Sequence, residues 1–222
     1  MTRFHRIATW PVLAALAFPV AAAATDNAHR IASIERGLRP AQALAGAPVP
    51  LSTLEGEMHR LHVPGLSIAV IDGGRLAWAK GYGVVGPGGG PVTPETLFQA
   101  ASISKPVAAF GAMTLVQSGK LDLHADINTQ LRSWKLPAAF GGAPVSPLQL
   151  LSHTGGLNVS GFPGYAPGMP VPTVLQVLDG AAPANTAPVR MTSPPGGAWQ
   201  YSGGGYTVLQ QLMTDVAGQP FE

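Results

Sequence analysis

The segment from Ser102 to Ser118 constrains the fold of this chain most, because it predicts a helix without a polar face. Pro106 is tolerated only near the first turn of a helix, and Gly119 is typical of the position after the last turn. The positions between are almost all apolar or small: Val107, Ala108, Ala109, Phe110, Gly111, Ala112, Met113, Leu115 and Val116. A helix that is apolar all round is expected to be buried by other elements. The sequence therefore predicts a central, buried helix.

Ser102 and Lys105 stand at the start of this helix, three positions apart. Residues with this spacing are neighbours on a helix surface, so we expect the hydroxyl and the amine to lie together. A desolvated lysine can accept the serine proton and turn the hydroxyl into a nucleophile. The two residues also have ordinary interpretations, Ser102 as a helix N-cap and Lys105 as a solvated charge.

The composition indicates a folded, loop-rich protein rather than a disordered chain. Apolar residues make up 46% of the 222 residues and charged residues 11%, beside 28 glycines and 22 prolines. Disordered chains carry more charge and fewer apolar residues. The chain has no cysteine, which excludes disulfides and thiolate metal ligands. The net charge of +2 disappears without Arg3 and Arg6, so the sequence predicts no basic face for nucleic acid.

The N-terminal segment predicts an export signal. It has a basic start at Arg3 and Arg6, an apolar stretch over 10–20, and four alanines at 21–24 that offer small residues for cleavage. The alternative is a membrane anchor, but the apolar stretch is shorter than the ~20 residues that span a bilayer. We expect residues 1–24 to be a signal peptide, and the protein to be exported to the periplasm or the extracellular space without a stable membrane span.

Local patterns predict a β-hairpin and several short helices. Two β-like runs, 66–71 and 75–80, flank Asp72-Gly73-Gly74, and a Gly-Gly pair is typical of a hairpin turn. Helical patterns occur at Ile31 to Leu38, at Leu54, Met58 and Leu61, after Ser146-Pro147, at Thr173 to Leu178, and along the stripe Tyr206, Leu209, Met213 and Val216 before Gly218. We expect the Ala/Pro-rich residues 25–50 to form a tether or a peripheral helix.

Three sequence blocks follow one another in a specific order. They are Ser-Ile-Ser-Lys at 102–105, Leu-Leu-Ser-His-Thr-Gly-Gly-Leu at 150–157, and Pro-Gly-Gly-Ala-Trp-Gln-Tyr-Ser-Gly-Gly-Gly-Tyr at 195–206. Together these blocks resemble the serine β-lactamase-related family, which includes class C β-lactamases, D-Ala-D-Ala carboxypeptidases and related esterases. The resemblance covers roughly residues 50–222.

The resemblance implies roles for three side chains. Ser102 is expected to be the nucleophile, Lys105 its general base, and Tyr201 the phenol that assists proton transfer to and from Ser102 and the leaving group. The backbone N–H of Ser102 is expected to be one of two oxyanion donors. By itself, Tyr201 has the alternative interpretation of an ordinary core aromatic.

The chain departs from the family pattern in two places. Gly203 stands where the family usually has an asparagine that contacts the lysine and the substrate carbonyl, so Gly203 is the candidate substrate-binding position. No Lys-Thr-Gly or His-x-Gly block follows the tyrosine block. We therefore expect a chain that is truncated before the C-terminal strands of the sheet and lacks the second oxyanion donor.

The sequence context of the histidines favours structural roles over catalysis or metal binding. His153 lies in a block that turns on Gly155-Gly156, and we expect it to hydrogen-bond to nearby backbone rather than to act as a triad base. His59 and His62 are three positions apart, but the sequence offers no further ligands for a metal. We expect neither a metal nor a cofactor.

These observations predict an α+β fold of the β-lactamase/transpeptidase type. An antiparallel sheet flanked by helices is expected within the hydrolase domain at 51–222, with a mostly helical lobe at 102–200 and the active site between sheet and lobe. The resemblance implies an exported serine hydrolase that forms an acyl-serine on a β-lactam, a D-amino-acid peptide or a small ester. The alternative is a non-catalytic member or inactive fragment that binds a peptidoglycan-like ligand or a partner protein.

Overall fold

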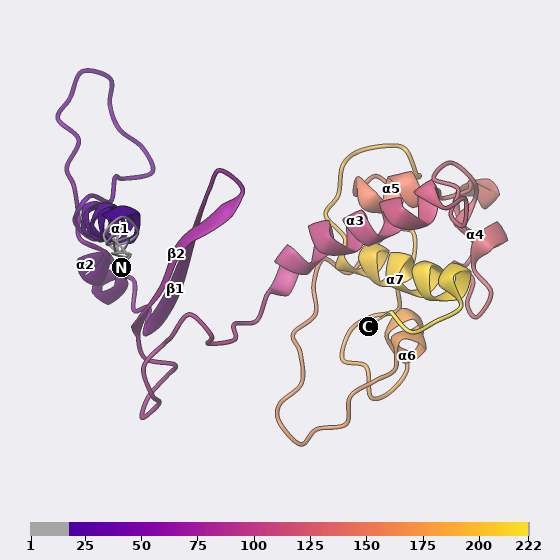
Figure 1. Cartoon of the computed structure of the whole chain (residues 1–222). Helices are drawn as coiled ribbons and strands as arrows, with labels where there is room; N and C mark the ends of the chain where they lie inside the picture. The colour runs from indigo at the N-terminus through magenta and orange to yellow at the C-terminus, as the bar shows by residue number, and fades with distance from the viewer. Residues whose placement is uncertain (1–17, 222) are drawn as a thin grey trace, which may run out of the picture. The chain divides into compact units, whose positions relative to one another are not determined.

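The computed structural model describes residues 18–221, and the chain divides into two compact units, Met1–Gln99 and Ala100–Glu222 (Figure 1). The first unit contains helices α1 (Phe18–Arg36) and α2 (Leu54–Arg60) and strands β1 (Gly65–Asp72) and β2 (Arg75–Gly83). The second contains α3 (Ser104–Gln117), α4 (Ile127–Gln130), α5 (Pro147–Leu151), α6 (Val174–Asp179) and α7 (Gly203–Ala217), with short 3-10 helices at Ala101–Ile103 and Phe140–Gly142. In the described part of the chain, no helix has the length and hydropathy needed to cross a membrane.

The predicted signal peptide lies mostly outside the described residues. Helix α1 begins at Phe18 and therefore extends across the predicted boundary between 1–24 and 25–50. It is longer than the pattern from Ile31 to Leu38 predicts and ends two residues earlier. Alanine-rich sequence favours helix, which explains the extension toward the N-terminus. Over 25–36 the structure thus has a helix, which is one of the two alternatives predicted for 25–50.

The β-hairpin prediction is confirmed. Strands β1 and β2 pair antiparallel, with Asp72 opposite Arg75 and a register shift between Val70 and Ile71. The two turn residues, Gly73 and Gly74, have φ of 55° and 74°, which glycine adopts without steric cost.

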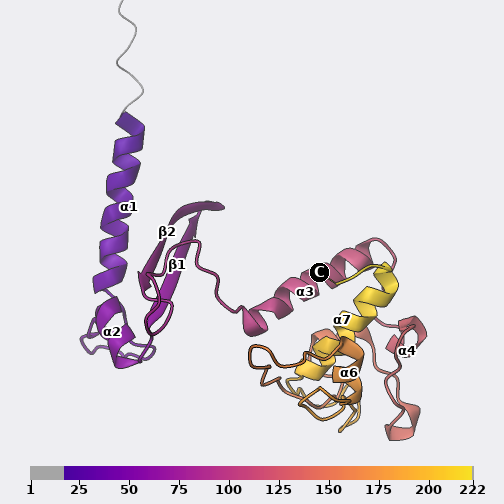
Figure 2. The same ribbon diagram turned by 90° about the horizontal axis from the view of Figure 1, so that it is seen from below.

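Helix α1 lies beside the hairpin (Figure 2), and polar side chains connect the two. Asn27 donates to the carbonyl of Ala77 at 3.0 Å. Arg30 pairs with Asp72 at 2.9 Å, and Lys80 pairs with Glu35 at 2.5 Å. Exposed ion pairs contribute only ~0–1 kcal/mol each. These pairs therefore fix the orientation of α1 on the hairpin more than they stabilise the unit.

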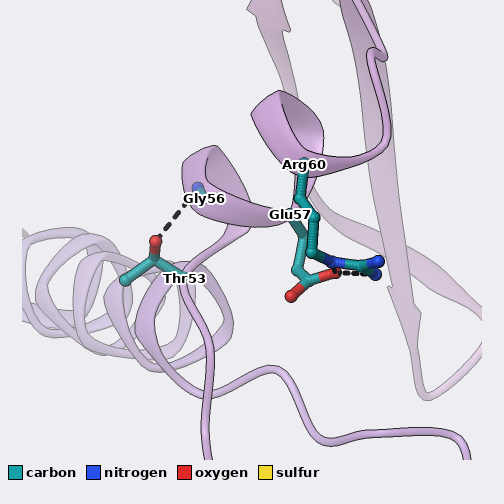
Figure 3. Close-up of polar contacts among 4 residues, drawn as sticks. All are labelled: Thr53, Gly56, Glu57 and Arg60. Carbon is teal, nitrogen blue, oxygen red and sulfur yellow. Dashed lines mark hydrogen bonds and ion pairs between the residues drawn. The ribbon is translucent and has the colours of Figure 1, made fainter.

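Helix α2 shows how local sequence sets a helix start (Figure 3). Thr53 is its N-cap and accepts a hydrogen bond from Gly56 N at 3.1 Å. Glu57 binds Arg60 three positions later, at 2.5 Å and 2.9 Å. The prediction of this helix from Leu54 onward is confirmed.

Helix α7, not α3, is the central buried helix of the second unit. Val208, Leu209 and Leu212 are fully buried, and α7 contacts α3, α4, α5 and α6. In α3 only Ala112 is buried, whereas Val107 and Phe110 are 71% and 76% exposed. The prediction of a buried α3 is therefore wrong for this unit. The physical reason is that, within this unit, α7 is the main helix that packs on α3. Most of the apolar surface of α3 is therefore left uncovered by the unit.

Capping residues set the helix boundaries in the second unit, as predicted at Ser146 and at Gly218. Ser146 and Thr173 form capping boxes at the starts of α5 and α6. Ser202 caps α7 by accepting from Gly205 N at 2.8 Å, and Gly218, with φ of 69°, ends it. The stripe predicted before Gly218 thus lies on the helix that forms the core.

Asp215 joins α7 to the segment that follows α4. Its carboxylate accepts hydrogen bonds from the backbone N–H groups of Arg132 and Ser133, from the Ser133 hydroxyl at 2.7 Å, and from Gln211. Burial tends to raise the pKa of Asp215, but the bonds from Arg132 and Ser133 outweigh it and hold this pKa below its ordinary value. The ionised carboxylate is therefore the form that the fold stabilises.

Replacing Asp215 with alanine is expected to lower the free energy of unfolding by about 2 kcal/mol, because it leaves backbone donors without their acceptor. Asp215→Asn keeps one acceptor oxygen and is expected to cost less. Because the folded pKa lies below the unfolded one, the contribution is present above pH ~4 and fades as pH falls through the folded pKa. Urea unfolding at pH 7 and pH 3 measures both effects. Equal stability of wild type and Asp215→Ala at pH 7 contradicts this account.

Candidate active site

The residues predicted for the active site come together in the second unit. Ser102 lies in the 3-10 turn that precedes α3, and Lys105 lies in the first turn of α3. Lys105 Nζ donates to Ser102 Oγ at 3.1 Å. Ser102 is exposed and Lys105 is half-buried. The Ser102 hydroxyl is thus open to solvent, while its amine partner is partly shielded.

Tyr201 brings the third predicted side chain to the same oxygen. Ser102 Oγ and Tyr201 Oη share a hydrogen bond of 2.7 Å, although the two residues are 99 positions apart in the sequence. Interactions with Lys105 first, and with Ser102 second, lower the pKa of the Tyr201 phenol below its ordinary value. Tyr201 is therefore suited to exchange a proton with Ser102.

Aromatic rings surround the ammonium group of Lys105. Lys105 Nζ lies 4.9 Å from the ring centroid of Tyr201 and 5.6 Å from that of Tyr206. The Tyr206 hydroxyl donates to the carbonyl of Leu151 at 3.2 Å, which fixes its ring. Burial, and then Tyr201, raise the pKa of Tyr206, so this phenol stays protonated. The sequence analysis assigned Tyr206 only to an apolar stripe; its place at the end of the tyrosine block was the available signal.

His153 makes the backbone contact that was predicted for it. Its Nδ1 accepts from Ser202 N at 3.1 Å. Its ring lies against those of Tyr201 and Tyr206, with centroid distances of 4.5 Å and 5.2 Å. The prediction of a structural histidine that binds nearby backbone is confirmed.

The start of α7 is fixed against the loop at 158–162. The Ser202 hydroxyl donates to the carbonyl of Asn158 at 2.7 Å. A Cβ at Gly203 would lie 3.1 Å from Ser160 O and 3.2 Å from the ring of Phe162. A side chain at position 203 would therefore press on the loop, which would have to shift by a few tenths of an ångström. Sequence reasoning missed Phe162, because a single aromatic in a Gly/Pro-rich loop carries no pattern.

A small cavity of about 190 Å³ lies beside Lys105. Ala108, Phe162, Gly203 and Tyr206 contribute to its lining. Ser104 also lines it, whereas Ser102 does not. The cavity is large enough for a short apolar group next to the Lys105 amine.

No group of three or more histidine or acidic side chains that suits a metal ion exists among residues 18–221. His59 and His62 therefore stand without further ligands in that range. The polar atoms that meet at Ser102 come from a hydroxyl, an amine and a phenol. Such a set suits proton transfer and nucleophilic attack rather than metal coordination.

A family model described as Beta-lactamase matches residues 52–222. The chain belongs to the beta-lactamase family. Among curated proteins, it is similar to Esterase EstB of Burkholderia gladioli, with 30% identity over 139 residues, which covers 60% of this chain and 35% of the relative. It is also similar to Penicillin-binding protein 4 of Amycolatopsis lactamdurans, with 29% identity, covering 72% of this chain and 40% of the relative. The chain spans well under half the length of these relatives.

Solved structures of the same family confirm the predicted resemblance and fold class. The octameric penicillin-binding protein homologue from Pyrococcus abyssi matches with a TM-score of 0.61 and 30% identity, covering 76% of this chain and 39% of that one. The β-lactamase/D-alanine carboxypeptidase from Yersinia pestis matches with a TM-score of 0.58 and 26% identity, covering 75% and 47%. The two-stranded antiparallel sheet and the helices belong to a β-lactamase/transpeptidase-like fold.

The three glycines that open α7 are expected to respond differently to alanine. A Cβ at Gly204 would lie 2.9 Å from Asn158 O and close to Val189, so Gly204→Ala is expected to cost about 1–3 kcal/mol of stability. At Gly205 the nearest atom would be the Ser202 hydroxyl at 3.3 Å, so Gly205→Ala is expected to be neutral or to gain about 0.5 kcal/mol. Gly203→Ala is expected to fall between them. Thermal melts of the three variants measure the order, and a more damaging Gly205→Ala contradicts the packing described here.

Proposed function

We propose that this protein is an exported serine hydrolase that acts through an acyl-Ser102 intermediate. One observation carries the proposal: Ser102 Oγ is hydrogen-bonded to both Lys105 Nζ and Tyr201 Oη. An isolated serine hydroxyl is a weak nucleophile, and two adjacent groups able to exchange its proton make it a strong one. Membership of the beta-lactamase family supports this chemistry.

In the acylation step, Ser102 Oγ attacks the carbonyl carbon of the substrate. The serine proton passes to Lys105 Nζ, which must be neutral to accept it, and a tetrahedral intermediate forms. The backbone N–H of Ser102 stabilises the developing oxyanion. The bond to the leaving group then breaks, and the leaving group takes the phenol proton of Tyr201. Lys105 returns a proton to Tyr201; both side chains are hydrogen-bonded to Ser102 Oγ.

In the deacylation step, water attacks the acyl carbon on Ser102. The same groups act in reverse, because a base in one direction of a proton transfer is an acid in the other. The water proton moves to the amine and phenol pair, the ester bond to Ser102 Oγ breaks, and this oxygen recovers its proton. The products are a carboxylic acid and free Ser102.

Among a β-lactam, a D-amino-acid peptide and a small ester, the geometry favours the ester. Gly203 supplies no side-chain amide that could contact the substrate carbonyl. A missing oriented donor near developing charge costs about 3 kcal/mol in the transition state. That loss weighs more on an amide or β-lactam than on an activated ester. The similarity to Esterase EstB supports the same order.

Export is proposed from the basic and apolar N-terminal segment 1–24. The protein would then meet its substrates in the periplasm or outside the cell.

A non-catalytic role in binding a peptidoglycan-like ligand is the second candidate, and Gly203 is the observation that favours it. The two functions differ in whether a covalent bond forms at Ser102. A ligand that binds reversibly, without any adduct under acylating conditions, favours the binding role.

Covalent labelling tests the proposed function. A fluorescent alkyl phosphonate is expected to label the wild-type protein, and Ser102→Ala is expected to abolish the label. Ser104→Ala is the matched control. Ser104 is next to Lys105 in the sequence, and this change leaves Ser102 Oγ with its hydrogen bonds to Lys105 and Tyr201. Mass spectrometry of the labelled peptide identifies the site. An adduct on Ser104 or Ser202, or no adduct in wild type, overturns the assignment of Ser102.

A further inference from the structure

His153 binds the backbone on both sides of Tyr201. Its carbonyl accepts from Gln200 N at 2.8 Å, and its side-chain Nδ1 accepts from Ser202 N at 3.1 Å. One residue thus holds the two peptide N–H groups that flank the tyrosine. Rotation or translation of the tyrosine backbone requires that at least one of these bonds break.

The imidazole of His153 also supports the ring of Tyr201. The two ring centroids are 4.5 Å apart, with an angle of 35° between the planes. Trp199 and Tyr206 lie against the same imidazole, at 5.9 Å and 5.2 Å. The phenol therefore reaches Ser102 from a stack of rings in which His153 is the common member.

The backbone of His153 is strained to make these contacts. Its φ is 59°, in the left-handed region that residues other than glycine adopt uncommonly. Such strain persists where surrounding bonds fix the conformation, and it often marks a functional position. Here the strained residue sends its carbonyl and its ring to the two neighbours of Tyr201.

The bond from Ser202 N requires a neutral imidazole with its proton on Nε2, because Nδ1 must carry a lone pair to accept. Protonation of Nδ1 would set a donor against the Ser202 N–H. The titratable and charged groups around the ring are Lys105 from α3, Tyr201 from the preceding segment and Tyr206 from α7. Burial first, and the charge of Lys105 second, lower the pKa of His153 and favour the neutral form.

We propose that neutral His153 is the positioning residue that holds Tyr201 on Ser102, and that protonation of its ring releases Tyr201. This inference rests on the proposed function of Ser102 and Tyr201. His153 itself takes no proton from substrate and touches no reacting atom. It acts through the N–H groups of Gln200 and Ser202 and through the ring contact with Tyr201. The rate of the reaction therefore depends on the protonation of His153 as well as on that of the general base.

Two variants separate the acceptor from the ring. His153→Asn places an amide oxygen near the position of Nδ1 and tolerates a positive φ, but it does not titrate. His153→Phe keeps a ring and removes the acceptor. With p-nitrophenyl acetate near pH 8, His153→Asn is expected to stay within about threefold of wild-type kcat, whereas His153→Phe is expected to lose about tenfold to 100-fold in kcat with KM nearly unchanged.

The pH profile gives a readout that a merely structural residue would not move. The wild-type enzyme requires both the general base of Ser102 and His153 to be deprotonated, so its log kcat/KM is expected to fall with a slope of about 2 at acidic pH. The His153→Asn variant requires only the general base, so its log kcat/KM is expected to fall with a slope of about 1. Equal slopes, or equal activities of the Asn and Phe variants, overturn the proposal.

A spectroscopic measurement keeps the proposal testable if a variant fails to fold. In wild type at neutral pH, the ¹⁵N shifts of His153 are expected to show an unprotonated Nδ1 and a protonated Nε2. A proton on Nδ1 overturns the proposal. Because this measurement needs no turnover, it is independent of phosphonate labelling: an unlabelled protein with the expected tautomer contradicts the proposed hydrolase while leaving the backbone contact intact.

Discussion

The hydrogen bond between Ser102 and Tyr201 is the interaction on which the proposed function of this chain depends. It joins the turn before α3 to the residue just before α7, and its length of 2.7 Å leaves little tolerance for movement of either segment. The burial of α7 fixes one side: Val208, Leu209 and Leu212 have no exposure, and Ser202 caps the helix beside Tyr201. The other side depends on α3, which packs on α7. The active site is therefore a product of helix packing within residues 100–221.

Charge and protonation follow from the same contacts. The Lys105 amine lies against the rings of Tyr201 and Tyr206. Hydrogen bonding with Lys105 and then Ser102 lowers the pKa of the Tyr201 phenol, while burial first and the charge of Lys105 second lower the pKa of the His153 imidazole. Burial raises the pKa of Tyr206 and keeps that phenol neutral. Two chemically identical phenols are thus separated by environment: Tyr201 is prepared to give up a proton and Tyr206 is not.

Local features were predictable from the sequence because local physics produces them. The Gly73-Gly74 turn, the cap at Ser146 and the three-residue spacing of Ser102 and Lys105 each need only a few neighbouring residues. The burial of a whole helix was not predictable in this way: an all-apolar pattern says that α3 can be covered, but not which elements cover it. The approach of Phe162 to Gly203, and the contacts of His153 with Tyr201 and Ser202, depend on loops that meet from distant parts of the chain.

The most direct test of this account is a crystal structure of the protein after reaction with an alkyl phosphonate. The account predicts a covalent bond between phosphorus and Ser102 Oγ, with Tyr201 Oη and Lys105 Nζ still within about 3.2 Å of that oxygen. Phosphorus bound to another serine contradicts the assignment of the nucleophile. Phosphorus on Ser102 with Tyr201 turned away contradicts the claim that the tyrosine and serine act as one unit.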